Sequence, residues 1–240
     1  MQALDLFLMF LLYSSAGWVW EVTLYAVRDH KVVNRGFLFG PLCPIYGCGA
    51  VLSVLLMYGR VTNPFLIFLL GMTVCTALEY GTHYLLEKFF HTTWWDYSKV
   101  RFNLHGRVCL PCSLAFGACI TALLCVVQPL VDTLLGAIPQ PVKYALAGVC
   151  YTLLVADLTL ALTGLLDLNK RLKALQETIV ASLQKNVDTN VEKQKLLSEQ
   201  LEQRLAELSK HRLIKSFPRI RSNRYAEALR AVLEKRKTKR

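Results

Sequence analysis

Residues 34–50 read NRGFLFGPLCPIYGCGA, and this stretch decides how the chain is expected to fold. It joins a polar loop to a long apolar run and contains one arginine, four glycines, two prolines and two cysteines, whereas a plain membrane anchor needs only aliphatic residues. Gly40 and Pro41 favour a turn or an irregular helix start. Irregular backbone at membrane depth is tolerated only where it is buried in protein or lines a cavity. The stretch therefore predicts either a shaped corner of a site or a loop that simply enters a helix.

The composition of the chain is typical of a multi-pass membrane protein. Of 240 residues, 54% are hydrophobic, and the mean hydropathy is +0.35, which is too apolar for a soluble globule of this size. Residues 1–167 carry nine Lys and Arg against nine Asp and Glu, whereas residues 168–240 carry nineteen against eight and contain no glycine. We therefore predict a transmembrane helical domain over 1–167 and a basic amphipathic helical tail over 168–240.

Five apolar runs, each near the length of about 20 residues that crosses a bilayer, predict an all-α bundle of about five transmembrane helices. The runs cover residues 4–28, 38–58, 64–86, 108–127 and 142–167. Lys and Arg concentrate in the first and third loops and directly after the fifth run. Such loops usually face the cytoplasm, so we expect the N-terminus outside the membrane and the tail in the cytoplasm.

The tail has an apolar stripe from Leu168 to Leu208 with a mean step of about 3.6 residues, closer to a straight helix than to a heptad coiled coil. A second copy of the chain, another subunit or the face of its own bundle could cover this stripe. Residues 212–240 hold eleven Lys and Arg against two Glu, which suits an anionic bilayer surface or a cytoplasmic partner. No motif that reads nucleic acid accompanies them, so no nucleic-acid partner is predicted.

Three carboxylates interrupt the apolar runs, namely Glu21, Glu79 and Asp157. A charged group near the bilayer centre costs about 3 kcal/mol or more, so such residues usually face the bundle interior and have a role. Glu21 and Glu79 each stand seven residues before the predicted cytoplasmic end of their run. At a rise of about 1.5 Å per residue, both lie about 10 Å deep, so we expect them at equivalent depths.

The loops that follow the two glutamates are similar to each other. Asn34-Arg35-Gly36 before Cys43 and Gly47 is echoed by Asn103 to Arg107 before Cys112 and Gly117. This pattern predicts two tandem helical hairpins that run in the same direction, plus one further helix; chance similarity between apolar hairpins is the alternative.

A tandem repeat would bring two glutamates and two arginines together as a charged pocket on the cytoplasmic half of the bundle. Arginine suits such a pocket because its planar fork binds a carboxylate or a phosphate at two points; alternatively, these groups only pair with one another. The predicted polar pocket, ligand-binding or structural, consists of Glu21, Asn34, Arg35, Glu79, Asn103, Arg107 and Asp157. The predicted helix-entry backbone positions are Gly36, Gly40, Pro41, Gly47 and Gly117.

No pattern predicts a metal site or a cofactor. The nearest approach to a metal site is a row of side chains at every fourth position, made of Glu79, His83, Glu87 and His91. Stronger metal signals pair two such helices. Cys109 and Cys112 form a single CxxC without the second pair that a zinc site needs. Phosphate-binding loops of the GxxxxGK[ST] type are missing, so an ATPase, if one is needed, must be another chain.

Several segments together resemble one known family. They are residues 34–50, Glu79 in the third run, WDYS at 95–98, the FN..GR pattern at 102–107 with Ser113 and Phe116-Gly117 after it, and RLIKSFPRIRSNRYAEAL in the tail. In this order, over nearly the whole chain, they look like the CmpB-like family of bacterial type IV ABC-transporter membrane components. The resemblance implies a bacterial multi-pass protein of the inner membrane, and it implies no substrate and no catalytic role.

Three functions are compatible with these features. The first is a transport-associated membrane subunit whose bundle holds the charged pocket and whose tail docks a partner such as a separate ATPase. The second is an intramembrane enzyme that acts on a lipid or a phosphate-bearing headgroup, with a carboxylate as acid or base. The third is a non-catalytic scaffold or sensor that acts through its tail. We favour the first, which makes the chain a transport component and not an enzyme.

Overall fold

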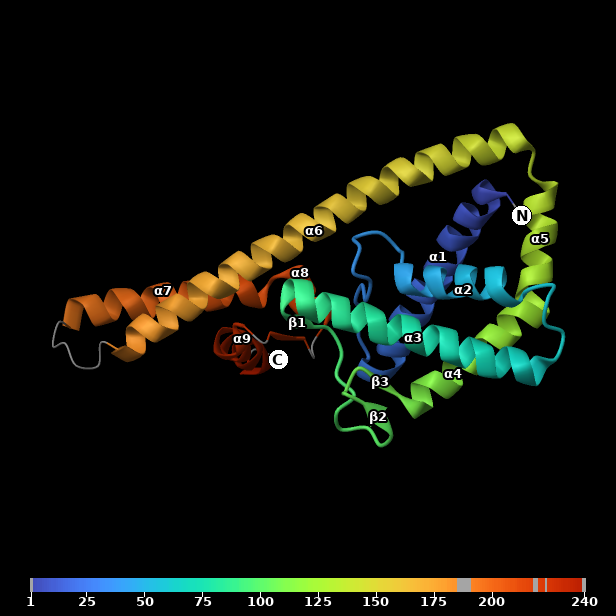
Figure 1. Ribbon diagram of the computed structural model, residues 1–240. Coiled ribbons are helices and arrows are strands. Elements are labelled where there is room, and N and C mark those ends of the chain that lie inside the picture. Colours follow the sequence, from blue (N-terminus) through green and yellow to red (C-terminus); the bar gives the residue numbers. More distant parts are fainter. Residues whose placement is uncertain (1, 185–190, 218–219, 223, 239–240) are drawn as a thin grey trace. The chain divides into compact units, whose positions relative to one another are not determined.

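The computed structural model describes residues 2–184, 191–217, 220–222 and 224–238 (Figure 1). Most of these residues are helical and the rest form loops and four two-residue strands, which confirms the all-α fold class. The chain divides into two compact units. The membrane unit comprises Met1–Leu85 and Asp96–Leu160, and the tail unit comprises Leu86–Trp95 and Ala161–Arg240.

Four helical stretches of the described chain are long and apolar enough to cross a membrane. They are α1 (Ala3–Asp29), α3 (Pro64–Phe90), α4 (Leu110–Ala122) with its continuation to Ala137, and the apolar part of α6 (Gln140–Gln184). The chain is therefore a multi-pass membrane protein.

The second apolar run forms a shorter helix than its length predicts. Helix α2 (Pro44–Met57) has 14 residues, which reach about 21 Å at a rise of about 1.5 Å per residue, less than the hydrocarbon core of about 30 Å. Residues 38–43, expected to be helical, are not. Pro44 occupies the first turn of α2, where the missing N–H costs nothing, and side chains bind the backbone groups before it, as described below.

The fourth run is longer than predicted because Gln128 and Pro129 do not end it. Helix α4 continues through the π-helical turn η1 (Leu123–Val127) into α5 (Gln128–Ala137). Proline lacks a backbone N–H and disrupts a regular helix, and the rare π-helix occurs mostly as a single turn of this kind inside an α-helix. The helix axis bends where α4 passes into α5 (Figure 1).

Glycines allow close packing within both hairpins of the membrane unit. A Cβ atom on Gly47 of α2 would lie 2.6 Å from the carbonyl oxygen of Phe10 of α1. A Cβ atom on Gly117 of α4 would lie 2.8 Å from the carbonyl oxygen of Phe68 of α3. Both glycines are predicted helix-entry positions, and each permits an approach that any other residue would block.

The hairpin between α3 and α4 contains a small strand pair. Strands β2 (Asn103–Leu104) and β3 (Val108–Cys109) are antiparallel, with Asn103 opposite Cys109 and Leu104 opposite Val108. Val108 and Cys109 are buried, and α4 begins directly after them.

The tail unit is a folded structure and not a single helix. Helix α6 runs without a break from its apolar part to Gln184, and α7 (Val191–Ser209), α8 (Arg212–Ser216) and α9 (Ala226–Thr238) follow. Strands β1 (Thr92–Thr93) and β4 (Arg221–Ser222) pair antiparallel. The predicted stripe passes over residues 185–190, which lie outside the described residues.

The first part of this stripe is covered by the tail unit of the same chain. Leu168, Leu172 and Leu175 of α6 are at most 1% exposed. Gln176 of α6 donates a hydrogen bond to Glu227 of α9 at 2.9 Å, and Arg171 of α6 forms an ion pair with Glu207 of α7 at 3.4 Å. Burial of these leucines therefore needs no second copy of the chain.

Candidate functional site

The side chain of Asn34 organises the loop between α1 and α2. Its Oδ1 accepts hydrogen bonds from the N–H of Gly36 at 2.9 Å and from Nε1 of Trp18 at 2.8 Å. Its Nδ2 donates to the carbonyl oxygen of Phe39 at 2.8 Å. A Cβ at Gly36 would be tightly packed, at 3.0 Å from the carbonyl oxygen of Leu42 and 3.2 Å from Oδ1 of Asn34. Asn34 and Gly36 therefore shape the loop.

Asp157 of α6 binds the backbone of the same loop. Its two carboxylate oxygens accept the N–H groups of Phe39 and Gly40, each at 2.7 Å. A Cβ on Gly40 would lie 2.9 Å from Oδ2 of Asp157. After Gly40 the chain turns at Pro41, since the N–H of Leu42 donates to the carbonyl oxygen of Gly40 at 2.9 Å. Residues 38–43 make no helical hydrogen bonds, and the carboxylate of Asp157 accepts hydrogen bonds from two of the backbone N–H groups in this loop.

Glu21 of α1 is hydrogen-bonded to a tyrosine of α2. The hydroxyl of Tyr46 donates to Oε1 of Glu21 at 2.6 Å. The ring of Tyr46 packs directly against Gly17 of α1, where any side chain would collide with it. The close packing of α1 and α2 therefore brings the hydroxyl of Tyr46 within hydrogen-bond distance of Glu21.

Glu79 of α3 is the most deeply buried carboxylate of the predicted pocket. It is 7% exposed, and its Oε1 accepts a hydrogen bond from the hydroxyl of Tyr97 at 3.2 Å. Its Oε2 is buried without a hydrogen-bond partner among the described residues. The two glutamates and their tyrosine partners all lie in the membrane unit. Glu21, Tyr46, Glu79 and Tyr97 form what we call the carboxylate site.

Tyr97, which lies in the loop between α3 and α4, is held as a proton donor. Burial raises the pKa of its hydroxyl, and the charge of Glu79 raises it further. The N–H of Tyr97 donates to the carbonyl oxygen of Gly106 at 2.8 Å. Asn103 steadies the same loop, because its Oδ1 accepts the N–H of Gly106 at 2.9 Å and its Nδ2 donates to Val100 at 2.7 Å. Asn103 thus acts on its loop as Asn34 does on the first.

The two predicted arginines are held over tyrosine rings. The guanidinium of Arg35 lies 4.9 Å from the ring centroid of Tyr25 on α1. The guanidinium of Arg107 lies 5.1 Å from the ring of Tyr80 and 5.2 Å from that of Tyr84, both on α3, and donates to the hydroxyl of Tyr80 at 2.7 Å. Cation–π contacts of this kind stabilise a charge where water is scarce. Each arginine is therefore tied to the helix that carries one glutamate.

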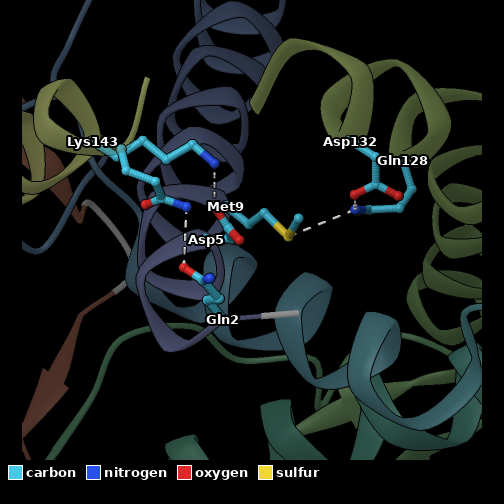
Figure 2. A network of polar contacts seen from close by, with 7 residues as sticks. Gln2, Asp5, Met9, Gln128, Asp132 and Lys143 are labelled. Atoms are coloured by element: carbon cyan, nitrogen blue, oxygen red, sulfur yellow. Dashed lines mark hydrogen bonds and ion pairs between the residues drawn. The ribbon is translucent and has the colours of Figure 1, made fainter. Parts of the chain in front are cut away.

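A second polar network, which we call the glutamine network, joins α1 to α5 and α6 (Figure 2). Gln128 is fully buried; its Oε1 accepts a hydrogen bond from the hydroxyl of Tyr13 at 2.5 Å, and its Nε2 donates to Asp132 at 2.8 Å. Lys143 forms an ion pair with Asp5 at 2.8 Å and is 5% exposed. Figure 2 shows the side chains of Lys143 and Asp5 pointing toward each other.

Reasoning from the sequence missed the glutamine network. The predicted fourth run ends at residue 127, so Gln128 and Asp132 lie beyond it, and Lys143 lies at the edge of the predicted fifth run. The available signal was the pair of polar residues Gln128 and Asp132, which follow the apolar run 108–127 and could have indicated a buried polar network. A partner more than 100 positions away, such as Tyr13 for Gln128, cannot be identified from spacing along the chain.

The row of acidic and histidine side chains on α3 does not assemble a metal site in the described part of the chain. No three His, Cys, Asp or Glu residues there are grouped so that they could hold an ion. His83, the second member of the row, is 5% exposed.

Comparison with known proteins identifies the family. No curated protein and no solved structure matches the chain significantly. A family model described as "Putative ABC-transporter type IV" matches residues 8–162. The match covers well over half of the chain and includes both hairpins, the carboxylate site and Asp157. The chain therefore belongs to the CmpB family, which carries the description "Putative ABC-transporter type IV".

Proposed function

We propose that this chain is a membrane subunit of a transporter, that its carboxylate site contacts the transported substrate, and that a separate ATPase drives the process. Membership in an ABC-transporter family supports the first part. The observation that carries the second part is the buried Oε2 of Glu79, which has no hydrogen-bond partner among the described residues. A buried acceptor of this kind costs about 1–3 kcal/mol or more unless something satisfies it.

The chemistry of the site suggests the kind of group it takes. Glu21 and Glu79 each receive one tyrosine hydroxyl, which leaves carboxylate acceptors for an N–H or O–H group of a ligand. Arg35 and Arg107, held by their tyrosines, supply positive charge for an anionic group. We infer a polar substrate with hydrogen-bond donors.

We further propose a bacterial inner-membrane location with the N-terminus outside and the tail in the cytoplasm. The distribution of Lys and Arg among the loops supports this orientation. Fusion of a phosphatase and of a fluorescent protein to the C-terminus tests it, since the first is active only outside and the second fluoresces only in the cytoplasm. An active phosphatase fusion would reverse the proposed orientation.

One purification tests the transporter assignment. The tagged chain is expressed in its native host, extracted into lipid nanodiscs and analysed by mass spectrometry for co-purifying subunits. We expect an ATP-binding subunit and ATP hydrolysis by the complex. A chain that purifies without any nucleotide-binding partner under conditions that preserve membrane complexes would refute the assignment.

Variants of the same complex test the carboxylate site separately. Glu79→Gln keeps the shape of the side chain and removes its charge, and we expect a changed rate of ATP hydrolysis because substrate occupancy and hydrolysis are coupled. Glu177→Gln is the control, since Glu177 is an exposed carboxylate of the tail unit with its side chain 67% exposed. An unchanged rate in Glu79→Gln would exclude the carboxylate site from transport while leaving the subunit assignment intact.

A further inference from the structure

We propose that the tail unit carries a binding site for a zwitterionic amino acid, in the cavity between α6 and α7. Arg204 receives the carboxylate of the ligand, and Glu207 receives its ammonium group. The cavity belongs to the tail unit, whereas the carboxylate site belongs to the membrane unit. The proposal therefore does not depend on what the carboxylate site binds or on the transporter assignment.

The cavity has room for a small molecule. Its volume is about 450 Å³, and small-molecule sites typically measure about 300–1,000 Å³. The residues that α7 contributes recur at helical spacing, which places them on one face of that helix. The lining consists of Gln200, Gln203, Arg204, Glu207 and Leu208 of α7 and of Arg171 and Ala174 of α6.

The cavity combines an apolar floor with a polar rim. Leu208 is 2% exposed, and Ala174 contributes only a methyl group, which leaves space between the two helices. Arg204 is half-buried, whereas Gln200 and Gln203 are exposed. A ligand can therefore enter from the solvent side, and the charge of Arg204 is partly shielded from water.

The charged side chains of the cavity are only partly engaged with one another. Arg171 forms ion pairs with Asp167 at 2.7 Å and with Oε2 of Glu207 at 3.4 Å, so two carboxylates share one guanidinium. Among the described residues, Oε1 of Glu207 has no hydrogen-bond or ion-pair partner, and neither has the guanidinium of Arg204. One carboxylate oxygen and one guanidinium therefore remain for a ligand.

These two groups favour a ligand that carries charges of both signs. Arg204 and Glu207 lie one helical turn apart, where Cβ atoms are about 5–6 Å from each other, and an amino acid carries its carboxylate and its ammonium group on a single carbon atom. The arginine fork binds a carboxylate at two points. Glu207 would repel a simple anion and Arg204 a simple cation, so a zwitterion is the ligand that fits.

The amide side chains of the rim favour an amino acid whose own side chain is polar. Gln200 and Gln203 both line the cavity. Each amide can donate and accept hydrogen bonds, and neither side chain is hydrogen-bonded within the described part of the chain. A polar side chain of the ligand can therefore be bound beside its charged groups.

Binding measurements on the full chain test this proposal. The protein is reconstituted in lipid nanodiscs, and calorimetric titration measures the Kd of each standard L-amino acid at millimolar concentration. We expect an amino acid with a polar side chain to bind. Its C-terminal amide lacks the carboxylate and its N-acetyl derivative lacks the ammonium group, so each should bind at least about tenfold more weakly.

Variants assign each end of the ligand to its residue. In Arg204→Gln the amino acid should bind at least about tenfold more weakly, and its amide should bind no worse than the amino acid, because the partner of the carboxylate is gone. In Glu207→Gln the N-acetyl derivative should likewise lose its disadvantage. Arg230→Gln and Glu199→Gln are the matched controls, since they remove exposed charges outside the cavity lining and should leave Kd unchanged.

Ala174→Leu tests the cavity without changing any charge. Leucine is nearly as good a helix former as alanine, and its longer side chain would occupy the space between α6 and α7. We expect this variant to keep the helix content of the wild type, measured by far-UV circular dichroism, and to lose amino-acid binding.

Four outcomes would overturn the proposal. Failure of every amino acid to bind at millimolar concentration would show that the cavity does not take this class of ligand. Equal binding of the amino acid and its two blocked derivatives to the wild type would exclude recognition of a zwitterion. Binding that is unchanged in both Arg204→Gln and Ala174→Leu would place the ligand elsewhere in the protein. Equal weakening in Arg204→Gln and Arg230→Gln would show an effect of overall charge and not of this arginine.

Discussion

Alanine at Gly47 should destabilise the membrane unit, whereas alanine at Gly81 should stabilise it. The new Cβ at position 47 would lie 2.6 Å from the carbonyl oxygen of Phe10, 2.8 Å from its ring, and against Oγ of Ser14. A backbone carbonyl cannot rotate away, so α1 and α2 must separate. Overpacking of this kind costs about 1–3 kcal/mol. At Gly81 nothing lies within 4 Å of the new Cβ, and alanine in place of glycine in a helix gains about 0.5–1 kcal/mol.

Thermal unfolding in nanodiscs, followed by near-UV circular dichroism, measures both changes. For a protein of this size, 1 kcal/mol moves Tm by about 2–4 °C. Gly47→Ala should therefore lower Tm by about 2–12 °C, and Gly81→Ala should raise it by about 1–4 °C. Gly117→Ala should behave like Gly47→Ala, because its Cβ would lie 2.8 Å from the carbonyl oxygen of Phe68. A Gly47→Ala protein as stable as Gly81→Ala would refute the close packing of α1 on α2.

Three further changes test other parts of the structure. Asp157→Asn leaves an amide N–H₂ facing a backbone N–H, which should cost about 1–3 kcal/mol and speed hydrogen exchange at the amide of Gly40, measured by mass spectrometry. Lys143→Met leaves the carboxylate of Asp5 without its ion-pair partner and should lower the free energy of unfolding by about 3–5 kcal/mol. In a double-mutant cycle, adding Asp5→Asn to the same chain should restore much of this stability. Burial lowers the pKa of His211 from its usual 6.5, so as the pH falls the imidazole is protonated in the unfolded chain before it is protonated in the folded protein. The free energy of unfolding should therefore decline from pH 6.5 down to the lowered pKa of the folded protein. Thermal unfolding of His211→Gln should not show this decline with pH.

Local patterns in the chain predicted the fold class and singled out the two glutamates of the carboxylate site. Apolar run lengths predicted membrane helices because bilayer thickness sets that length directly. Glu21 and Glu79 stood out because a carboxylate in an apolar run is costly. The hydrogen-bond donors of the two glutamates could not be recognised in the same way. In the sequence, Tyr46 and Tyr97 look like ordinary aromatic residues of a membrane protein, and only the packed structure brings their hydroxyls within hydrogen-bond distance of the glutamates.

The corner at residues 34–50 shows where sequence reasoning stops. Gly40 and Pro41 predicted an irregular segment, because the backbone preferences of glycine and proline act within one or two residues. Asp157 binds this segment from 117 positions away from Gly40. This contact depends on how α6 packs, and no periodic pattern in the sequence predicts it.

Length, hydropathy and charge thus sufficed for a helical membrane protein with a basic tail, because those properties are sums over neighbouring residues. The folding of the tail around β1 and β4, the glutamine network and the tyrosine partners of the charged groups required the three-dimensional arrangement. Each depends on directed contacts between side chains far apart in the chain, and such contacts exist only once the helices are packed.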